Sequence, residues 1–225
     1  MLSNPKTARN GNILAAVGMV AAILATIFLH EGEVNTIIYG LIFGAIALGT
    51  IVGWLTAKRV QMTKMPELVS LFNGMGGACA ALIGLVEFHH NLDNSTNIAI
   101  ILAGMIIGSV SFSGSIIAWA KLNGTLRNAI RLPKYNILNT IILIGLVVYS
   151  VFIVWSGTHS EAHLYGLFTA AIIYGILFVI PIGGADMPVV ISLLNSFTGL
   201  AAAFGGFLYG NQVMLTGGIL VGSAG

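Results

Sequence analysis

The sequence predicts an all-α fold, a polytopic transmembrane helix bundle of about eight spans with the last one truncated. Hydrophobic residues make up 57% of the 225 residues and charged residues only 7%, whereas a soluble domain carries about 25% charged residues. The mean hydropathy is +0.97. A soluble domain of this size cannot bury so much apolar surface, and the same composition excludes disorder. The few charges form no basic footprint for nucleic acid.

Each expected helix is a run of about 20 mostly apolar residues, since each residue rises about 1.5 Å across a core of about 30 Å. Residues 1–11 form an N-terminal segment, and 12–225 form one transmembrane domain. The last run has 13 residues and no polar flank, so we expect a span that is cut rather than a re-entrant segment. The helices are expected at about 12–29, 35–57, 66–88, 96–119, 136–156, 164–181, 188–209 and 213–225.

The basic residues orient these helices. All nine lie before the first helix, between the second and third, or between the fourth and fifth. With alternating spans these connections share one side, which the positive-inside rule makes cytoplasmic. The first run lacks a small-x-small cleavage site, which disfavours a signal peptide. The basic residues are Lys6, Arg9, Lys58, Arg59, Lys64, Lys121, Arg127, Arg131 and Lys134; the opposite side carries Glu31, Glu33, Glu87, Asp93, Glu161, His30, His89, His90, His159 and His163.

Two helices share a repeated segment. MPELVSLFNGMGGACAA runs over 65–81 and MPVVISLLNSFTGLAAA over 187–203, at a constant offset of 122 residues. Both segments enter the membrane from the same side, so the repeat is parallel rather than inverted. A spacing of three and four residues places its members on one helix face. That face carries Pro66, Ser70, Asn73, Gly77, Ala80 and Gly84 in one helix and Pro188, Ser192, Asn195, Gly199, Ala202 and Gly206 in the other.

The two asparagines predict a polar seam. Each lies seven residues after its proline, about 10 Å along the helix, and we expect both to face a common seam lined by Ser70 and Ser192. Packing is the alternative, because an interhelical hydrogen bond in a membrane averages only ~0.6 kcal/mol. Intramembrane polar groups are nevertheless functional candidates. Ser109, Ser113 and Ser223 add hydroxyls nearby, while Gly77, Gly199, Gly218, Gly222 and Gly225 are expected to pack at the seam.

Without a resemblance to a known family, the residues indicate a helix bundle with a polar seam and a function in transport, and nothing more specific. The middle of each span lacks Lys, Arg, Asp, Glu and His, where a conventional proton pump would place a titrating group. Gly74–Gly77 lies inside a helix with no preceding strand, so it is no phosphate loop. The single cysteine, Cys79, excludes an intrachain disulfide and a cysteine-based metal cluster, and no metal site is expected. We therefore expect no catalytic residue on this chain.

Four segments are far less generic: MPELVSLFNGMGGACAALIGLVEF, GSVSFSGSIIAWAKL, IPIGGADMPVVISLLNSFTGLAAAFGGF and TGGILVGSAG. They resemble the membrane domain of the beta subunit of proton-translocating NAD(P) transhydrogenase, over about Asn10 to Gly225. The resemblance implies coupling of proton movement to hydride transfer between NAD(H) and NADP(H). It implies that this segment binds no cofactor, that an NADP(H)-binding domain follows residue 225, and that alpha-subunit membrane helices and an NAD(H)-binding domain are partners. The whole complex is then a dimer in the lipid bilayer of the bacterial inner membrane, with a cytoplasmic N-terminus.

The resemblance also implies roles for single residues. Asn195 matches a polar residue on the family's seam. Asp186 matches an acid of the cytoplasmic loop facing the NADP(H) domain, although it is equally placed to cap the following helix. Gly222, Ser223 and Gly225 match the last helix. Many relatives carry a histidine at the position of Asn73, whose amide cannot titrate but both donates and accepts hydrogen bonds.

The expected proton path therefore comprises Asn73, Asn195, Ser70, Ser192, Ser109, Ser113 and Ser223, with the titrating group supplied by a partner helix. Glu67 is expected to be structural, in a first helical turn where the dipole favours it. His89 and His90 are expected on the outer surface. The alternatives are a stand-alone secondary transporter, with its substrate between helices 66–88 and 188–209, and a passive membrane anchor. The sequence beyond Gly225 would separate them.

Overall fold

The computed structural model describes residues 5–28, 35–92, 94–126, 133–157 and 160–224. Within these ranges the chain forms eight α-helices, two short 3-10 turns and no strand, which confirms the all-α prediction. Seven helices are long and apolar enough to cross a membrane, and one apolar helix is shorter. The chain is thus a multi-pass membrane protein. The positions Gly225, His30, Glu31, Glu33, Asp93, Arg127, Arg131 and His159, used above, lie outside the described residues.

The helices lie close to the expected runs, with shifted ends. The first begins at Pro5 rather than at 12, and the fourth continues to Leu122. The helices are α1 Pro5–Phe28, α2 Thr36–Arg59, α3 Met65–His90, α4 Ser95–Leu122, α5 Tyr135–Ser156, α6 Glu161–Val179, α7 Met187–Leu208 and α8 Gln212–Ala224; the turns are η1 Met62–Lys64 and η2 Gly184–Asp186.

The chain divides into two compact units, Met1–Arg59 and Val60–Gly225. In the first unit, α1 and α2 expose almost all of their apolar side chains, and no described residue of α2 is buried. Helices of this kind are covered by lipid or by other membrane helices. The repeat and the residues of the expected proton path all belong to the second unit.

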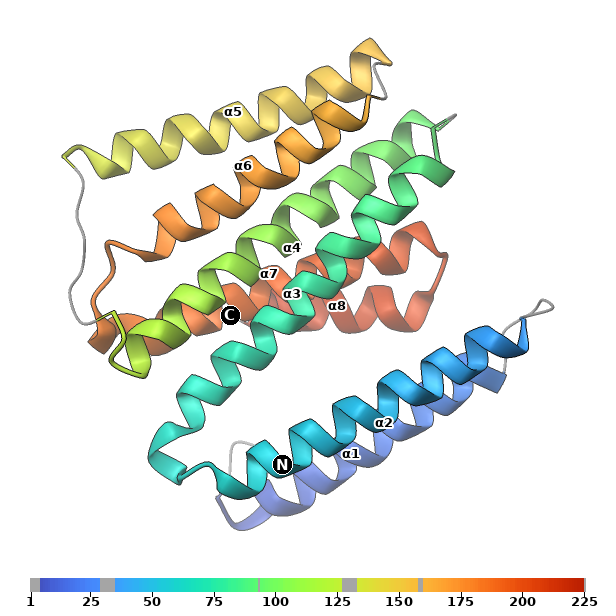
Figure 1. Cartoon of the computed structure of the whole chain (residues 1–225), viewed down its shortest axis with the longest axis vertical. Coiled ribbons are helices and arrows are strands. Elements are labelled where there is room, and N and C mark those ends of the chain that lie inside the picture. The colour runs from blue at the N-terminus through green and yellow to red at the C-terminus, as the bar shows by residue number, and fades with distance from the viewer. Residues whose placement is uncertain (1–4, 29–34, 93, 127–132, 158–159, 225) are drawn as a thin grey trace. The chain divides into compact units, whose positions relative to one another are not determined.

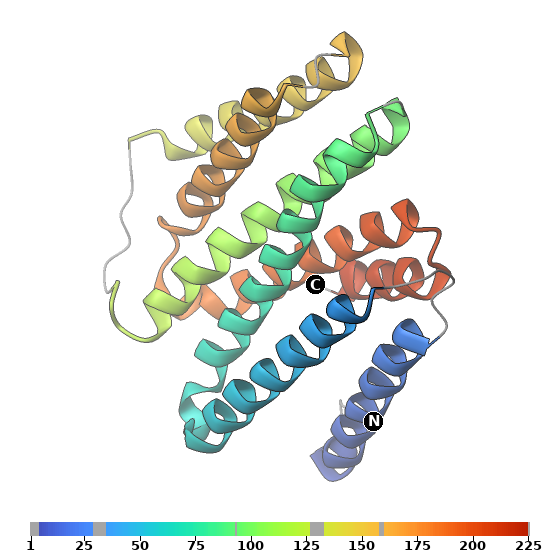
Figure 2. The same cartoon turned by 45° about the vertical axis from the view of Figure 1, so that its right-hand side comes forward.

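In the second unit α4 is the central helix. It packs against α3, α5, α6 and α7 and is the most buried of the long helices. Figures 1 and 2 show α5 and α6 side by side, with α7 and α8 forming a hairpin. Leu102 and Met105 of α4 are almost fully buried against Phe88 of α3 and Leu167 of α6. Since lipid tails are as apolar as these side chains, close packing rather than water exclusion holds such helices together.

Local signals explain where these helices begin. Asn94 precedes α4, and its side-chain oxygen accepts hydrogen bonds from the backbone N–H of Thr96 at 3.0 Å and of Asn97 at 3.3 Å. This satisfies two of the donors that every helix start leaves unpaired. Helices α3 and α7 each carry proline in the first turn, where its missing N–H costs nothing.

The second unit has two chemically distinct ends. At the basic end, which carries Lys64, Lys121 and Lys134, α3 and α7 begin. At the histidine end, the Tyr149 hydroxyl lies 2.5 Å from Nδ1 of His163, and Nε2 of His89 lies 3.6 Å from Oε1 of Glu161. This is the separation of charge that the basic residues predicted for the connections of this unit.

Glycine sets the distance between α3 and α4. A Cβ on Gly77 would lie 2.7 Å from the carbonyl oxygen of Gly108, and a Cβ on Gly108 would lie 2.8 Å from that of Gly77. Both separations are too short for a carbon atom, so the two backbones touch here. This close approach brings the polar side chains one turn away into hydrogen-bonding range.

Candidate functional site

A cluster of neutral polar side chains joins three helices of the second unit. We call it the amide–hydroxyl cluster: Ser70 and Asn73 of α3, Ser111 and Ser115 of α4, and Thr198 of α7. Nδ2 of Asn73 donates to Oγ of Ser115 at 3.0 Å and to Oγ of Ser111 at 3.3 Å. The Ser70 hydroxyl donates to the backbone carbonyl of Ser115 at 2.8 Å. The first half of the cluster therefore ties α3 to α4.

The second half ties α4 to α7. The Ser111 hydroxyl is 2.9 Å from the carbonyl oxygen of Leu194 and 2.6 Å from Oγ1 of Thr198. Oγ1 of Thr198 is in turn 3.1 Å from the same Leu194 carbonyl. Each hydroxyl has one proton, so two protons serve three contacts. The cluster therefore has alternative hydrogen-bond arrangements that differ only by rotation of hydroxyl groups.

Asn73 retains an unused acceptor. Both protons of its amide nitrogen are engaged by Ser111 and Ser115. Its Oδ1 accepts no hydrogen bond from a described residue, and the side chain is half-buried. An amide oxygen accepts up to two hydrogen bonds. Asn73 is therefore placed to accept a hydrogen bond from a water molecule or from a group outside this chain.

None of the five side chains of the amide–hydroxyl cluster ionises at ordinary pH. In the described part of the second unit, the acidic, basic and histidine side chains lie near the two helix ends rather than beside the cluster. The same described residues contain no group of three or more His, Cys, Asp or Glu placed to hold a metal ion. The cluster can therefore orient and relay hydrogen bonds, but it cannot itself store a proton.

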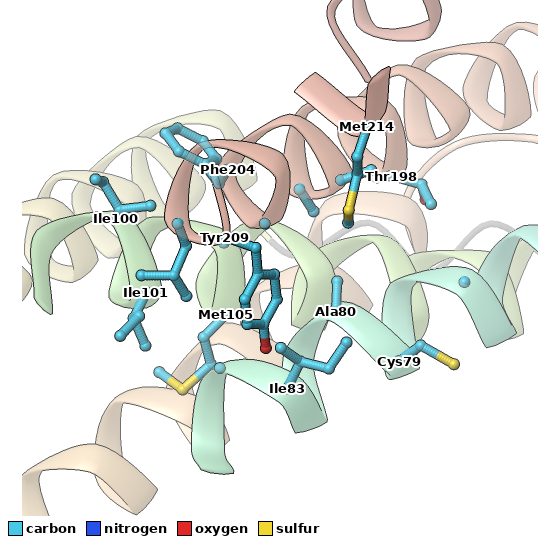
Figure 3. A pocket seen from close by; sticks show the side chains of 17 residues that line it. Cys79, Ala80, Ile83, Ile100, Ile101, Met105, Thr198, Phe204, Tyr209 and Met214 are labelled. Carbon is cyan, nitrogen blue, oxygen red and sulfur yellow. The ribbon is translucent and has the colours of Figure 1, made fainter. Parts of the chain in front are cut away.

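A cavity of about 250 Å³ adjoins the cluster on the side of the histidine end. Its walls come from α3, α4 and α7, with Met214 of α8, and they are almost entirely apolar. Figure 3 shows Thr198 and Met214 at one part of the wall, and Tyr209, the residue that follows α7, reaching toward Ile83 of α3. A cavity with so few polar partners holds water poorly.

Tyr209 and Glu87 meet beside this cavity. The Tyr209 hydroxyl donates to Oε1 of Glu87 at 2.9 Å, and Nδ2 of Asn91 donates to Oε2 at 3.1 Å. Asn91 accepts in turn from Asn97 of α4 at 2.9 Å. Burial, together with the hydrogen bond to Glu87 and its negative charge, raises the pKa of Tyr209 from 10.0 to about 12. The pair thus links α3, α4 and α7 at the histidine end.

Three of the expected hydroxyls lie away from the cluster. Ser109 and Ser113 are buried, but they donate to carbonyls of their own helix, Met105 at 2.6 Å and Ser109 at 3.0 Å. Ser113 lies on the face of α4 that meets Gly175 of α6. Ser223 is exposed and donates to the carbonyl of Leu220 at 3.0 Å. Of the expected proton path, only Ser70 and Asn73 therefore lie in the amide–hydroxyl cluster.

The structure does not bring Asn195 and Ser192 to the seam at which Asn73 lies. Both are exposed, and neither side chain forms a hydrogen bond with another described residue. The backbone carbonyl of Ser192 accepts from the Ser196 hydroxyl at 3.4 Å. The reason is that the small face of α7 packs on α8, as the small face of α3 packs on α4. A shared helical face does not require that the two faces meet.

The expected packing glycines show this directly. A Cβ on Gly199 would lie 2.7 Å from the backbone nitrogen of Gly222, and one on Gly218 would overlap the backbone of Ala203. Gly222 is itself in contact with the Leu200 side chain. Gly77 lies between α3 and α4, as described above. The glycine face of α7 thus serves the α7–α8 hairpin.

Asp186 lies in the connection between α6 and α7. It occupies the N-cap position of α7, yet its side chain makes no capping hydrogen bond and is exposed. Glu67 is half-buried in the first turn of α3, while His89 and His90 are exposed at the histidine end. Asp186 therefore presents a free carboxylate beyond the end of the bundle.

The sequence interpretation did not assign functional roles to Ser111, Ser115, Thr198 or Lys121. Ser111 and Ser115 follow Gly104 and Gly108 on a face of α4 that reads as a packing surface. Thr198 stands three residues after Asn195 and 122 after Gly76. A Cβ on Gly76 would lie 3.1 Å from the methyl group of Thr198. Because the repeat pairs Thr198 with a glycine, the offset gave no signal for its hydroxyl. Lys121 was counted only as one of the basic residues.

We compared the chain with known proteins to find the family to which it belongs. The family model described as NAD(P) transhydrogenase beta subunit matches residues 1–225. Two curated beta subunits of NAD(P) transhydrogenase from Rhodospirillum rubrum are each 38% identical over 234 residues, covering 100% of this chain and 49% of the relative. The chain thus spans about half the length of these relatives. With a family match along its whole length, the chain belongs to the family of NAD(P) transhydrogenase beta subunits.

Proposed function

We propose that the chain is the proton-conducting membrane part of an NAD(P) transhydrogenase. In the complete enzyme it would couple transmembrane proton movement to hydride transfer between NAD(H) and NADP(H), which takes place on soluble domains. The observation that carries the proposal is the amide–hydroxyl cluster, which joins α3, α4 and α7 through neutral, rotatable hydrogen-bonding groups. Family membership supports a role for this cluster in the proton path.

The chemistry of the cluster suits the relay of a proton along water. Oδ1 of Asn73 accepts a hydrogen bond from a water molecule, while its amide nitrogen donates to Ser111. Ser111 and Thr198 are hydrogen-bonded to each other and to the Leu194 carbonyl. Since these side chains do not ionise, the proton is carried by water or by a titrating group of a partner helix, such as those of the alpha subunit. Ser109, Ser113 and Ser223 are secondary candidates, because their hydroxyls bond to their own helices.

We assign the apolar cavity next to the cluster the role of interrupting proton conduction. A continuous hydrogen-bonded chain across the membrane would dissipate the proton gradient without doing work. The wall between Thr198 and Tyr209 offers few polar partners for water, so it interrupts such a chain. Conduction would then require that this stretch become hydrated, which gives the enzyme a point of control.

Asn195 and Ser192 join the path in the longer subunit that we propose. Gly199 faces Gly222 and Gly206 faces Leu215, so α7 and α8 run antiparallel in a fixed register. One further turn of α8 in this register would lie against Asn195. We propose that the subunit continues in this way and then into an NADP(H)-binding domain.

The remaining parts of the assembly are also proposals. They comprise alpha-subunit membrane helices, an NAD(H)-binding domain and a dimer of the whole complex. The membrane is the bacterial inner membrane, with the basic end and the N-terminus cytoplasmic by the positive-inside rule. Asp186, exposed beyond that end, would then face the NADP(H) domain and mediate coupling. NADP(H) and NAD(H) are bound outside this segment. A stand-alone transporter is not favoured by the family match.

The test uses the complete enzyme in membranes. Asn73→Leu removes the amide at nearly constant volume and leaves Ser111 and Ser115 without their donor. The variant removes the group that orients water at the cluster, and a barrier raised by about 1.36 kcal/mol slows a reaction about tenfold. We expect proton-linked transhydrogenation to fall by about this factor or more, while hydride exchange without net proton transfer is largely retained. Equal loss of both, with assembly intact, would contradict a proton-conducting role for the cluster.

A further inference from the structure

The side chain of Lys121 is buried at the basic end. It lies in the last turn of α4 and only 7% of the residue is exposed. Lysine is almost never buried without partners, because an ammonium group loses its hydration there. Neither the relay through the amide–hydroxyl cluster nor the coupling role of Asp186 accounts for this residue.

The partners of Lys121 are three backbone carbonyls. Its Nζ donates to the carbonyl of Val179 at 3.2 Å, to that of Ile180 at 2.5 Å, and to that of Ile182. An ammonium group has three protons and no acceptor. All three protons are therefore used, and all three acceptors belong to one short stretch of chain.

These carbonyls lie at the end of a helix, and that of Val179 also accepts from the Ile182 N–H at 3.1 Å. Helix α6 ends at Val179, and the last carbonyls of a helix have no partner within it. Pro181 follows and cannot continue the helix. The negative end of the helix dipole also lies here, and it favours a cation. Lys121 thus closes the end of α6 from a different helix, at 58 to 61 residues' separation.

The charge of Lys121 has no carboxylate beside it. In the described part of the chain no Asp or Glu forms an ion pair with it. Its charge is balanced by carbonyl dipoles alone, so the contact depends on the carbonyls of Val179 and Ile182 staying where they are. The α6–α7 connection is held correspondingly firmly against α4.

The held stretch leads directly to Asp186. Three residues separate Ile182 from Asp186, and this short segment is folded by a hydrogen bond of 3.1 Å from the Asp186 N–H to the Gly183 carbonyl. The turn η2, which ends at Asp186, also packs against α4. Fixing Ile182 therefore fixes the point from which the exposed carboxylate projects.

We propose that Lys121 is a positioning residue that clamps the α6–α7 connection to α4 and thereby sets the position of Asp186. The second half of this inference rests on the coupling function proposed above for Asp186. The first half is a statement about the fold and stands apart from it. The clamp provides a mechanical link between α4, which carries Ser111 and Ser115, and the surface at which Asp186 lies.

The clamp is tested by labelling, without reference to activity. Ala185 is exposed within η2, so Ala185→Cys in a Cys79→Ser background reports on the connection. We measure its rate of reaction with a maleimide in opened membranes that contain the complete subunit. Lys121→Met keeps the apolar stem and removes the ammonium, and we expect labelling to become severalfold faster. The control Lys64→Met removes an exposed charge at the same end and should leave the rate unchanged.

An unchanged labelling rate in Lys121→Met would overturn the clamp. Should this variant fail to accumulate in membranes, Lys121→Arg takes its place. A planar guanidinium directs its donors differently from an ammonium, so we expect faster labelling there as well. A parental rate in the arginine variant would equally overturn the requirement for an ammonium at this point.

The positioning role is tested by a double-mutant cycle in the complete enzyme. We compare the proton-linked activity of Lys121→Met, Asp186→Asn and the double variant. If Lys121 acts through Asp186, the double variant loses no more activity than Asp186→Asn alone. Multiplying losses would overturn the positioning role. Full activity of Asp186→Asn would instead refute the coupling function of Asp186, and the labelling result would still decide the clamp.

Discussion

The hydroxyl of Tyr209 donates a 2.9 Å hydrogen bond to Glu87, and the two residues stand 122 apart in the chain. This is the same offset at which the Met-Pro segments of α3 and α7 repeat. Gly76 and Thr198, at the same offset, also lie in contact. The two repeated helices therefore meet at equivalent positions from their middles to the histidine end. Toward the basic end the equivalent residues Asn73 and Asn195 are not brought together.

The Tyr209–Glu87 pair should be visible in an optical titration. The chain has six tyrosines, so the difference in absorbance between the parent and Tyr209→Phe isolates one of them. We expect this difference to titrate at about pH 12, because burial and Glu87 raise the pKa of Tyr209 to about 12. Glu87→Gln removes the charge and should lower the midpoint. A midpoint near 10 in the parent would show that the pair does not form.

The same shift predicts how stability depends on pH. A folded pKa above the ordinary value means that the folded state binds this proton more tightly than the unfolded state. The contribution of Tyr209 is therefore complete below pH 10 and is lost as the pH rises toward 12. Unfolding in detergent between pH 9 and about 12 should show a steeper loss for the parent than for Tyr209→Phe. Parallel curves for the two proteins would contradict the shift.

Close contact between α3 and α4 predicts which glycines tolerate a methyl group. Gly77→Ala or Gly108→Ala places a carbon atom within 2.7–2.8 Å of a facing carbonyl oxygen. Overpacking of this kind costs about 1–3 kcal/mol, which unfolding by a denaturing detergent would measure. Gly145→Ala in α5 has nothing within 4 Å and is the matched control. Equal stability of the three variants would show that the backbones do not touch.

Thr198 should matter for coupling in a way that a similar threonine does not. Thr198→Val removes the hydroxyl that meets Ser111 and keeps the shape of the side chain. We expect proton-linked activity of the complete enzyme to fall several times more than hydride exchange. Thr169 also bonds to the carbonyl four residues before it, at 2.8 Å, but on an exposed face of α6. Thr169→Val should therefore leave both activities unchanged, and an equal effect of the two variants would exclude a special role for Thr198.

Asp186 should govern coupling rather than folding. Its carboxylate is exposed and makes no capping hydrogen bond, so Asp186→Asn removes a charge without removing a contact within the described chain. We expect normal assembly in the membrane, measured by the amount of subunit, with a large loss of proton-linked activity. Retention of full activity and proton pumping would refute the role of this connection.

Asn195 provides a test of the longer subunit. Asn195→Leu should reduce proton-linked activity selectively if a further turn of α8 buries the amide. Asn195→Asp introduces an ionisable group and should add a new pH dependence to that activity. A leucine variant that loses hydride exchange and proton-linked activity equally, with assembly intact, would remove Asn195 from the path.

Helical periodicity and charge were sufficient for the class of fold and for the chemical difference between the two ends. They were also sufficient to single out Asn73 and Ser70, because polar groups on a small-residue face are rare within a span. They could not predict which helix each small-residue face packs against. Asn73 and Asn195 occupy equivalent faces, but that face of α3 packs on α4, whereas that face of α7 packs on α8. Lys121 was out of reach for a different reason: its acceptors are backbone carbonyls, which every residue possesses, so no pattern marks them.

The two hydroxyl protons of Ser111 and Thr198 that serve three contacts have a kinetic consequence. When a proton passes along a row of water molecules, every O–H bond in that row ends up pointing the other way. The hydroxyls that hold those waters in place must adopt the orientation that favours the starting arrangement before a second proton can follow. With an alternative acceptor already within 2.6–3.1 Å of each oxygen, this reset needs rotation alone and no movement of a helix. Because the row ends in the amide protons of Asn73 on one side and in the Leu194 carbonyl on the other, the cluster would orient the water that carries the proton rather than carry the proton itself.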